Sequence, residues 1–304
     1  MKAPQRRAPP RRKVDGVLLL DKPAGLTSNA ALQHAKRLFN AAKAGHTGTL
    51  DPLATGVLPL VLGRATRLAR FLTAAEKVYD ATIRLGFSTE TYDAEGAPAG
   101  AVYEGPLPDR DAIERALDGF RGTLLQQPPL FSAKKIAGRR SYDSAREGLN
   151  VLPAPAAVTV YELRTIACDR DIVTLRVRCS AGFYVRTLAH DLGRVLGTGA
   201  HLAGLRRTGC AGFGLDAAMP LAAIEADPSR ALAAVVPPAA MLGSLAAVTL
   251  TAEEVNRVAR GLDVRARPSP ESRFVRLLDP AGELVAVAEP AGVPDVLHPA
   301  VVLK

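Results

Sequence analysis

The sequence predicts an α+β fold with a large first domain and a small second one. Residues 78–87 and 173–179 alternate apolar and polar side chains with a period of two, which is typical of strands buried on one face. Residues 28–39, 111–120 and 185–195 place apolar side chains at helical spacing instead. The chain has 304 residues, so it can bury a substantial core and divide into two domains.

The first elements lead to a loop with unusual chemistry. Residues 17–20 form an apolar strand, and Ser28 is expected to cap the helix that follows. The core face of this helix comprises Leu32, Ala35, Leu38 and Phe39. A glycine-containing loop around Asp51 comes next. The strand over 78–87 then begins its apolar face with Tyr79.

The second half of the large domain contains another strand with a helix on each side of it. Residues 111–120 form a short helix, and the strand over 173–179 follows later in the chain. The turn at 180–182 leads from this strand into a helix. The expected core side of that helix comprises Val185, Leu188, Leu192 and Val195.

A change in composition marks the end of the large domain. Residues 217–245 are rich in Ala and Pro and lose all alternation, so we expect a connection there. The sequence therefore predicts one domain over 14–243 and a small one over 246–304.

The small domain has a recognisable helix and two strands. Residues 251–254 have the pattern of a capping box, which opens a helix that Gly261 closes. Residues 274–278 and 283–287 are expected to be strands joined by a tight turn that contains Pro and Gly.

Basic residues are concentrated at the N-terminus. The net charge is +9, and the first 13 residues contribute six basic side chains without an acid, which leaves +3 for the remainder. Residues 1–13 are therefore expected to form a disordered basic arm that can contact phosphates. Any further nucleic-acid site must be a local concentration of charge on a mildly basic body.

Other common classes of site and location find no support in the sequence. Cys168, Cys179 and Cys210 have no metal-binding spacing, so we expect three small core residues. The five histidines are scattered, and phosphate-binding and dinucleotide-binding loops are missing, so we expect neither a metal nor a cofactor. The sequence shows no signal peptide and no membrane span, which predicts a cytoplasmic protein without membrane contact.

The loop around Asp51 has the composition of a site that presents one carboxylate to a ligand. Gly45, Gly48 and Gly56 allow crowded or left-handed backbone close to a ligand. Pro52 restricts the backbone directly after the acid. An ordinary turn in which Asp51 caps the next element remains the alternative for this loop alone.

Four further motifs accompany this loop in one order along the chain. They are 15–28, which contains Asp21-Lys22-Pro23, then Lys77-Val78-Tyr79, 180–187 and 199–207. Together the five motifs closely resemble the TruB family, the bacterial tRNA pseudouridine-55 synthases. The resemblance implies the pseudouridine synthase fold, with a mixed and largely antiparallel sheet flanked by helices and loops. It also implies isomerisation of uridine 55 in the T-loop of tRNA, with the T-loop and stem as partner and no cofactor.

The resemblance assigns a role to each matching residue. Asp51 is the catalytic carboxylate, and whether it attacks C1′, adds to the base or takes a ribose proton stays open. Arg186 pairs with Asp51. A guanidinium in contact with a carboxylate favours its ionised form, whereas burial favours the neutral acid. The residues implied to surround the flipped base are Tyr79, Tyr184, Leu205, Lys22 and Asp93. His46 matches the histidine that enters the space the uridine leaves.

Two further segments are implied to contact RNA. Residues 126–148 mix basic and aromatic side chains, a composition that suits phosphate neutralisation and base stacking, and they match a clamp over the RNA. Phe131 stands where the family often has tyrosine, so a hydroxyl contact is in doubt there while stacking remains possible. Residues 246–304 resemble in position the small β-barrel-like RNA-binding domain called PUA.

Three other functions are open to a sequence of this kind. The guide-RNA-dependent synthases of archaea and eukaryotes share the Asp51 motif, but the insert over 126–148 favours a stand-alone enzyme with no guide RNA or obligatory protein partner. A non-catalytic RNA-binding or RNA-folding protein would not need Asp51, Tyr79 and Arg186 together. A glycosidase generally needs two cooperating carboxylates, and the loop offers one.

Overall fold

The structure is a computed structural model in which five ranges are described: 13–131, 135–136, 139–140, 153–266 and 273–304. The expected arm, apart from Lys13, and most of the expected clamp over 126–148 lie outside the described residues. Within the described ranges, helices long and apolar enough to cross a membrane are absent.

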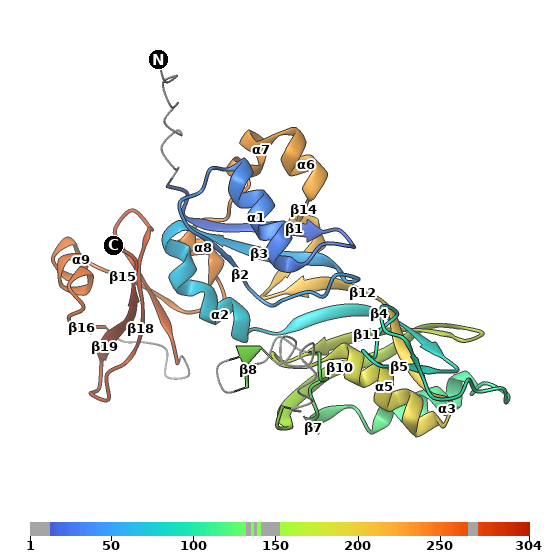
Figure 1. The fold of residues 1–304 in the computed structure, drawn as a ribbon. Coiled ribbons are helices and arrows are strands. Elements are labelled where there is room, and N and C mark those ends of the chain that lie inside the picture. Colours follow the sequence, from blue (N-terminus) through green and yellow to red (C-terminus); the bar gives the residue numbers. More distant parts are fainter. Residues whose placement is uncertain (1–12, 132–134, 137–138, 141–152, 267–272) are drawn as a thin grey trace, which may run out of the picture.

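A ten-stranded sheet forms the centre of the larger body (Figure 1). Its main path runs in the order β14 (Met219–Pro220), β1 (Gly16–Lys22), β3 (Thr55–Leu62), β12 (Ala200–Cys210), β4 (Lys77–Leu85), β11 (Ile172–Cys179), β10 (Ala156–Asp169) and β7 (Gly122–Gln126). Off this path, β2 (Ala44–His46) pairs with β3 and β13 (Phe213–Gly214) with β12. The pairs β1–β14 and β3–β12 are parallel, and the remaining pairs are antiparallel. The expected mixed, largely antiparallel sheet is confirmed.

The two predicted alternating strands are confirmed with small shifts at their ends. In β4 the side chains from Lys77 to Leu85 alternate between buried and more exposed positions, with Tyr79 on the buried face. The same alternation runs through β11, which pairs with β4 over its whole length. This pairing lies in the middle of the sheet, so Tyr79 is held by strands on both sides.

The strand β1 is buried on both faces because different layers cover them. Leu18 and Leu20 pack in the cluster that contains residues of α1 (Ser28–Leu38). Val17 and Leu19 pack with η1 (Gly63–Leu68), α2 (Ala69–Ala74) and the C-terminal module. The alternation of side chains along a strand explains why each face has its own cluster.

Two further helices, α3 (Arg110–Asp118) and α5 (Val185–Leu196), lie beside the second half of the sheet. Two expectations about the helices of the large domain are wrong. The prediction that Ser28 caps α1 is wrong, since Thr27 accepts a hydrogen bond from the Ala30 amide as N-cap. In α5 the expected burial of Val195 is also wrong, because the buried stripe runs through Leu188, Ala189 and Leu192 and leaves Val195 56% exposed.

The expectation that all three cysteines are core residues holds for two of them. Cys179 and Cys210 are buried, whereas Cys168 is exposed. Cys168 lies at the far end of β10, opposite Val173 and close to the hairpin turn, where the neighbouring β10 residues are exposed as well.

The segment over 217–245 is not a plain connection. It contains η2 (Leu215–Ala217), β14, α6 (Leu221–Ala226), α7 (Pro228–Ala233) and α8 (Pro238–Met241). Val236 and Val17 exchange two backbone hydrogen bonds of 2.9 Å, which attach the segment to β1. Helices this short have too few residues to show a period, which is why the sequence did not reveal them.

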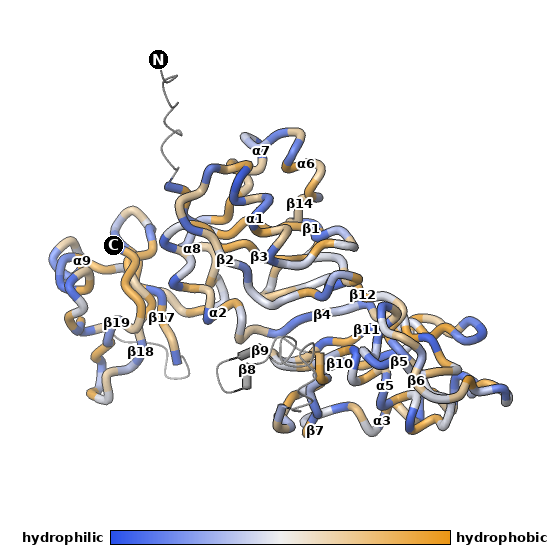
Figure 2. Tube along the Cα trace, viewed as in Figure 1, coloured by the Kyte–Doolittle hydropathy of each residue, from blue (hydrophilic) through white to orange (hydrophobic). Residues whose placement is uncertain are grey.

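A curled five-stranded sheet and one helix form the C-terminal module (Figure 1). The strands follow the order β15 (Ala247–Thr249), β17 (Val275–Leu278), β18 (Leu284–Pro290), β19 (Val296–Val302) and β16 (Val264–Arg265). The helix α9 (Ala252–Ala259) begins with the expected capping box between Thr251 and Glu254. Figure 2 shows hydrophobic residues along the strands of this module and hydrophilic residues on α9.

Two short hairpins complete the described elements. They are β5 (Ser88–Thr89) with β6 (Pro98–Ala99) and β8 (Lys135–Ile136) with β9 (Arg139–Arg140).

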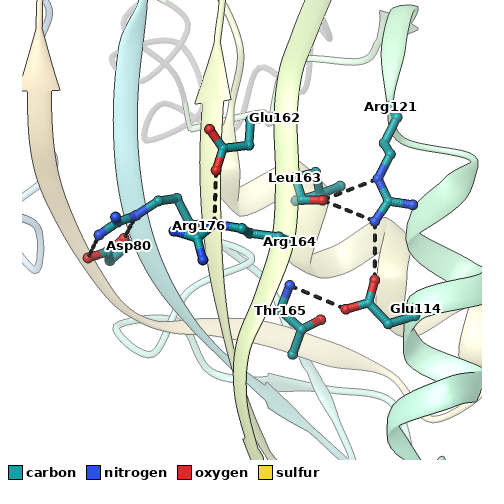
Figure 3. Close-up of polar contacts among 8 residues, drawn as sticks. All are labelled: Asp80, Glu114, Arg121, Glu162, Leu163, Arg164, Thr165 and Arg176. Atoms are coloured by element: carbon teal, nitrogen blue, oxygen red, sulfur yellow. Dashed lines mark hydrogen bonds and ion pairs between the residues drawn. The ribbon is translucent and has the colours of Figure 1, made fainter.

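Ion pairs and hydrogen bonds connect β4 with β11, and β10 with the region of α3 (Figure 3). Arg176 of β11 binds Asp80 of β4 through two nitrogens, each 2.8 Å from a carboxylate oxygen. On the other side, Arg121 donates to Glu114 and to the Leu163 carbonyl, which ties α3 to β10. Asp80 and Arg176 therefore lie at strand positions that alternate with the buried ones.

Gly56 permits the close approach of β3 to β12 and provides a test of this packing. A Cβ at Gly56 would lie 2.1 Å from the Arg207 carbonyl oxygen, at a φ of +102°. Gly86 has nearly the same φ, +107°, but no described atom lies within 4 Å of its Cβ position. We expect Gly86→Ala to lower the free energy of unfolding by about 1–3 kcal/mol through backbone strain, and Gly56→Ala to lower it further through the clash. Urea unfolding of both variants measures this, and equal losses would contradict the packing.

Candidate active site

The loop that carries Asp51 connects β2 with β3 and is fixed by the start of α1. The Ser28 hydroxyl donates to the Leu50 carbonyl at 3.0 Å and accepts from the Leu50 amide at 2.8 Å. This single side chain binds both backbone groups of the residue directly before Asp51. Ser28 therefore has a positioning role in place of the capping role predicted for it.

Lys22 fixes the same loop from the end of β1. Its fully buried ammonium donates to the carbonyls of Pro23 and Leu26, at 2.9 and 2.7 Å, and to that of Pro52 at 3.4 Å. The Gly25 amide also donates to the Pro52 carbonyl, at 2.9 Å. Burial lowers the pKa of Lys22 to about 8, and the nearby Asp51 carboxylate opposes this shift. The structure thus places Lys22 behind the loop.

Arg186, in the first turn of α5, is paired with Asp51. Its Nε lies 2.9 Å from Oδ2 of Asp51, and the side chain of Arg186 is 8% exposed. Nη1 donates to the Thr91 carbonyl at 3.1 Å, and Nη2 donates to the Phe131 carbonyl at 2.8 Å. These contacts hold the planar guanidinium in one orientation against the carboxylate.

A second carboxylate, that of Asp93, lies on the other side of Arg186. Oδ2 of Asp93 is 3.5 Å from Nη1 of Arg186. Oδ1 accepts from the Thr91 hydroxyl at 2.5 Å and from the Glu95 amide at 3.1 Å. Asp93 is almost fully buried, so it supports the guanidinium from inside the protein.

The surroundings of Asp51 make its carboxylate more basic than usual. Burial raises its pKa, and the charge of Arg186 opposes that shift, while the negative charge of Asp93 adds to it. The side chain still keeps 36% of its surface exposed, so the carboxylate can be reached by a ligand. A reachable carboxylate with a raised pKa and a bound guanidinium is suited to nucleophilic or proton-transfer chemistry.

Asp51 and Arg186 open into a cavity of about 240 Å³. Tyr79, Tyr184 and Leu205 also line this cavity, so the structure brings five of the eight predicted site residues together there. Tyr79 is 8% exposed, and burial raises its pKa to about 12. The three other predicted residues are placed outside the cavity lining: Lys22 behind the loop, Asp93 behind Arg186, and His46 at the end of β2.

Gln126, which the sequence analysis did not single out, positions Tyr184. Its side-chain oxygen accepts from the Tyr184 amide at 2.8 Å, and its side-chain nitrogen donates to the Tyr184 carbonyl at 3.0 Å. A lone glutamine at the end of a strand has no signal in the sequence. The contact depends on the distant β7 lying beside the start of α5.

Among the described residues, neither a second hollow nor a metal-binding cluster gives an alternative position for the predicted site. A larger hollow of about 880 Å³ lies between α2, α8 and Phe274, and none of the predicted site residues lines it. Groups of three or more His, Cys, Asp or Glu that could hold a metal ion are absent from the described part of the chain.

The fold and this site define a class of protein. Two solved structures share the fold over 95% of this chain, with a TM-score of 0.72 each: an H/ACA RNP bound to a substrate RNA containing 2′-deoxyuridine, at 25% identity, and a Cbf5-Nop10-Gar1 complex, at 28% identity. Both matches cover 85% of the other chain. The sheet and its helices therefore have the pseudouridine synthase fold.

Sequence comparison identifies the family within this class. Residues 36–185 match the N-terminal domain of the TruB family pseudouridylate synthases, and residues 186–242 match the C-terminal domain of tRNA pseudouridylate synthase B. The tRNA pseudouridine synthase B of Solibacter usitatus is 43% identical over 95% of this chain and all of its own length. That of Aromatoleum aromaticum is 48% identical over 91% of this chain and 89% of its own. The chain belongs to the TruB family of pseudouridylate synthases.

The buried ammonium of Lys22 makes the stability of the fold depend on pH. Its pKa is about 8 in the folded chain against an ordinary value of 10.5, so the unfolded chain binds more protons between these values. The free energy of unfolding must therefore rise with pH across this window.

Lys22→Met removes this dependence. We expect the stability of the unmodified chain relative to Lys22→Met to grow by about 3 kcal/mol between pH 8 and pH 10.5. Urea unfolding at a series of pH values measures the difference. A difference that stays constant across the window would contradict the burial of a charged Lys22.

Proposed function

We propose that this enzyme isomerises uridine to pseudouridine at position 55 in the T-loop of tRNA, with Asp51 as the reacting carboxylate. The observation that carries the proposal is the 2.9 Å ion pair between Asp51 and Arg186 at a cavity that Tyr79 also lines. The names of the relatives, at 43% and 48% identity, support tRNA as the substrate.

The proposed reaction requires a carboxylate of the kind that lines this cavity. It breaks the bond between N1 and C1′, turns the uracil and bonds C5 to C1′, with no net oxidation or hydrolysis. A carboxylate beside C1′ is needed, together with exclusion of water so that the detached base is retained. Asp51 supplies this carboxylate. Its reaction is attack on C1′, addition to the base or removal of a ribose proton. Arg186 orients it and stabilises its charge.

A uridine reaches this cavity by leaving the RNA stack. Tyr79 and Tyr184 offer aromatic rings and hydroxyls to the flipped base, and Leu205 offers an apolar wall. His46, at the end of β2, is proposed to enter the space left in the RNA. Lys22 is proposed to position the Asp51 loop, and Asp93 is proposed to position Arg186.

The regions outside the cavity are proposed to bind the T-loop and stem. They are the basic arm over 1–13, the clamp over 126–148 and the PUA-like module over 246–304. Such contacts position RNA mainly through its backbone and its shape. The cytoplasmic location expected from the sequence stays a prediction.

The solved structures favour a second candidate, a synthase that works inside a guide-RNA complex. One of them is an H/ACA RNP bound to a substrate RNA, at 25% identity, and the other is a Cbf5-Nop10-Gar1 complex, at 28% identity. The relatives named tRNA pseudouridine synthase B are more similar, at 43% and 48%, and this supports a stand-alone enzyme without a guide RNA or an obligatory protein partner.

Mapping pseudouridine in tRNA treated with the purified chain tests the proposal. We expect product at position 55 of bare tRNA, with no guide RNA added. Asp51→Asn should lower the single-turnover rate by more than about 10³-fold, the scale of losing a catalytic nucleophile, while tRNA binding persists because the amide keeps the shape. Product only after a guide RNA is added would favour the second candidate, and a fast Asp51→Asn variant would remove Asp51 from the chemistry.

Tyr79→Phe separates the ring of this side chain from its hydroxyl. The ring preserves apolar area and stacking, so tRNA binding should change little. A proton must leave C5 after the base has reattached, and we expect the ionised Tyr79 oxygen to take it. Without this oxygen the single-turnover rate should fall by about 10²-fold or more. Quench measurements at saturating enzyme give this rate. A rate close to that of the unmodified chain would leave Tyr79 as a stacking residue alone.

A further inference from the structure

Arg207 is a fully buried cation for which folding alone gives no reason. It lies on β12 with no exposed surface, and its Nε donates to the Val57 carbonyl at 2.7 Å. In the described part of the chain, neither Nη1 nor Nη2 has a hydrogen-bond partner. Buried donors without partners, and above all a buried charge without a counter-charge, lower stability.

The guanidinium of Arg207 is held beside Tyr79. The two residues are directly opposite each other in the pairing of β12 with β4, and both line the cavity of about 240 Å³. Gly48, at a φ of +71°, covers the guanidinium, since a Cβ there would be 3.1 Å from Nη1. Two strands and the Asp51 loop therefore confine this side chain.

The charge of Arg207 acts on the Tyr79 hydroxyl. Burial raises the pKa of Tyr79 to about 12, and Arg207 opposes the shift by its charge and by its closeness to the hydroxyl, although the contact is not a well-aligned hydrogen bond. Cys179 from β11 and Cys210 from β12 also lie near this hydroxyl, and only as thiolates would they act in the opposite direction to Arg207. Burial raises the pKa of Cys179 to about 12, so its thiol is neutral and does not cancel the guanidinium.

Other charged side chains of the cavity already have partners. The Lys77 ammonium donates to the Thr73 and Ala75 carbonyls, at 2.6 and 2.5 Å. Asp51 and Arg186 are paired with each other. In the described residues around this cavity, Arg207 thus has terminal donors available beside the Tyr79 oxygen.

We propose that Arg207 is a positioning residue that holds the Tyr79 hydroxyl and stabilises the negative charge on its oxygen during removal of the C5 proton. This inference rests on the proposed function. Tyr79 first loses its hydroxyl proton to water. After C5 has bonded to C1′, the C5–H bond breaks and its proton goes to the Tyr79 oxygen. The electron pair of that bond re-forms the C5–C6 double bond, the π bond between C6 and N1 breaks with its electrons going to N1, and N1 takes a proton from water.

This assignment predicts that Arg207 contributes to rate and costs stability. Arg207→Met keeps an unbranched side chain and removes the buried charge, so we expect an equal or higher melting temperature. The single-turnover rate should fall by about 10-fold or more, a part of the usual contribution of acid–base catalysis. Arg207→Lys keeps the charge and should retain more of the rate.

The pH dependence distinguishes a positioning role from a packing role. Removing Arg207 raises the pKa of Tyr79, so the alkaline inflection of the single-turnover rate should move to higher pH in Arg207→Met. The matched control is Arg176→Met on the neighbouring strand β11, where the arginine binds Asp80. This variant should keep the unmodified profile. In a Tyr79→Phe background, Arg207→Met should cause no further loss of rate.

A direct titration tests the inference without relying on activity. With 3-fluorotyrosine at position 79, the fluorine resonance reports ionisation of that hydroxyl, and Arg207→Met should raise its midpoint. An unchanged midpoint, or equal rate losses with and without the Tyr79 hydroxyl, would overturn the role of Arg207. Should Arg207→Met not fold, the titration midpoint of residue 79 and the pH profile of the single-turnover rate are measured in Arg207→Lys to decide the role of Arg207. Failure of the unmodified chain to form pseudouridine would overturn the proposed function, while the titration would still decide whether Arg207 acts on Tyr79.

Discussion

The ion pair between Arg186 and Asp51 is the interaction on which the rest of the site depends. Asp51 comes from the loop between β2 and β3, and Arg186 comes from the start of α5, so the pair connects two distant parts of the sheet across 2.9 Å. Burial alone would favour a neutral carboxyl group, and the guanidinium opposes this effect. Asp93 binds the other side of Arg186 and so supports the pair from within the protein.

Backbone contacts keep the two partners of this pair in place. Ser28 binds both backbone groups of Leu50, and Lys22 donates to the Pro52 carbonyl, so the residues on either side of Asp51 are fixed. On the other side, Gln126 binds both backbone groups of Tyr184 just before Arg186. These three side chains lie on β1, α1 and β7, and they give the site a rigid frame that is suited to orienting a reacting group.

The membership of the TruB family and the geometry of the cavity give complementary information. Membership defines the enzyme class, and the names of the relatives support tRNA as the proposed substrate. The geometry adds the buried cations, since Lys22 and Arg207 are both fully buried near Asp51 and Tyr79. Their cost to stability is understandable if the enzyme must place positive charge near atoms that become negative during the reaction.

The sequence by itself determined the elements whose signal is local. Alternation in 78–87 and 173–179, and the capping box at Thr251, need only neighbouring residues, and the structure has β4, β11 and α9 there. The motif around Asp51 likewise marked the loop that lines the cavity. Tertiary structure decided that Val195 and Cys168 are exposed, that 217–245 packs on β1, and that Arg207 lies beside Tyr79. These outcomes depend on which strand lies next to which, and the periodicity of one segment contains no information about its neighbours.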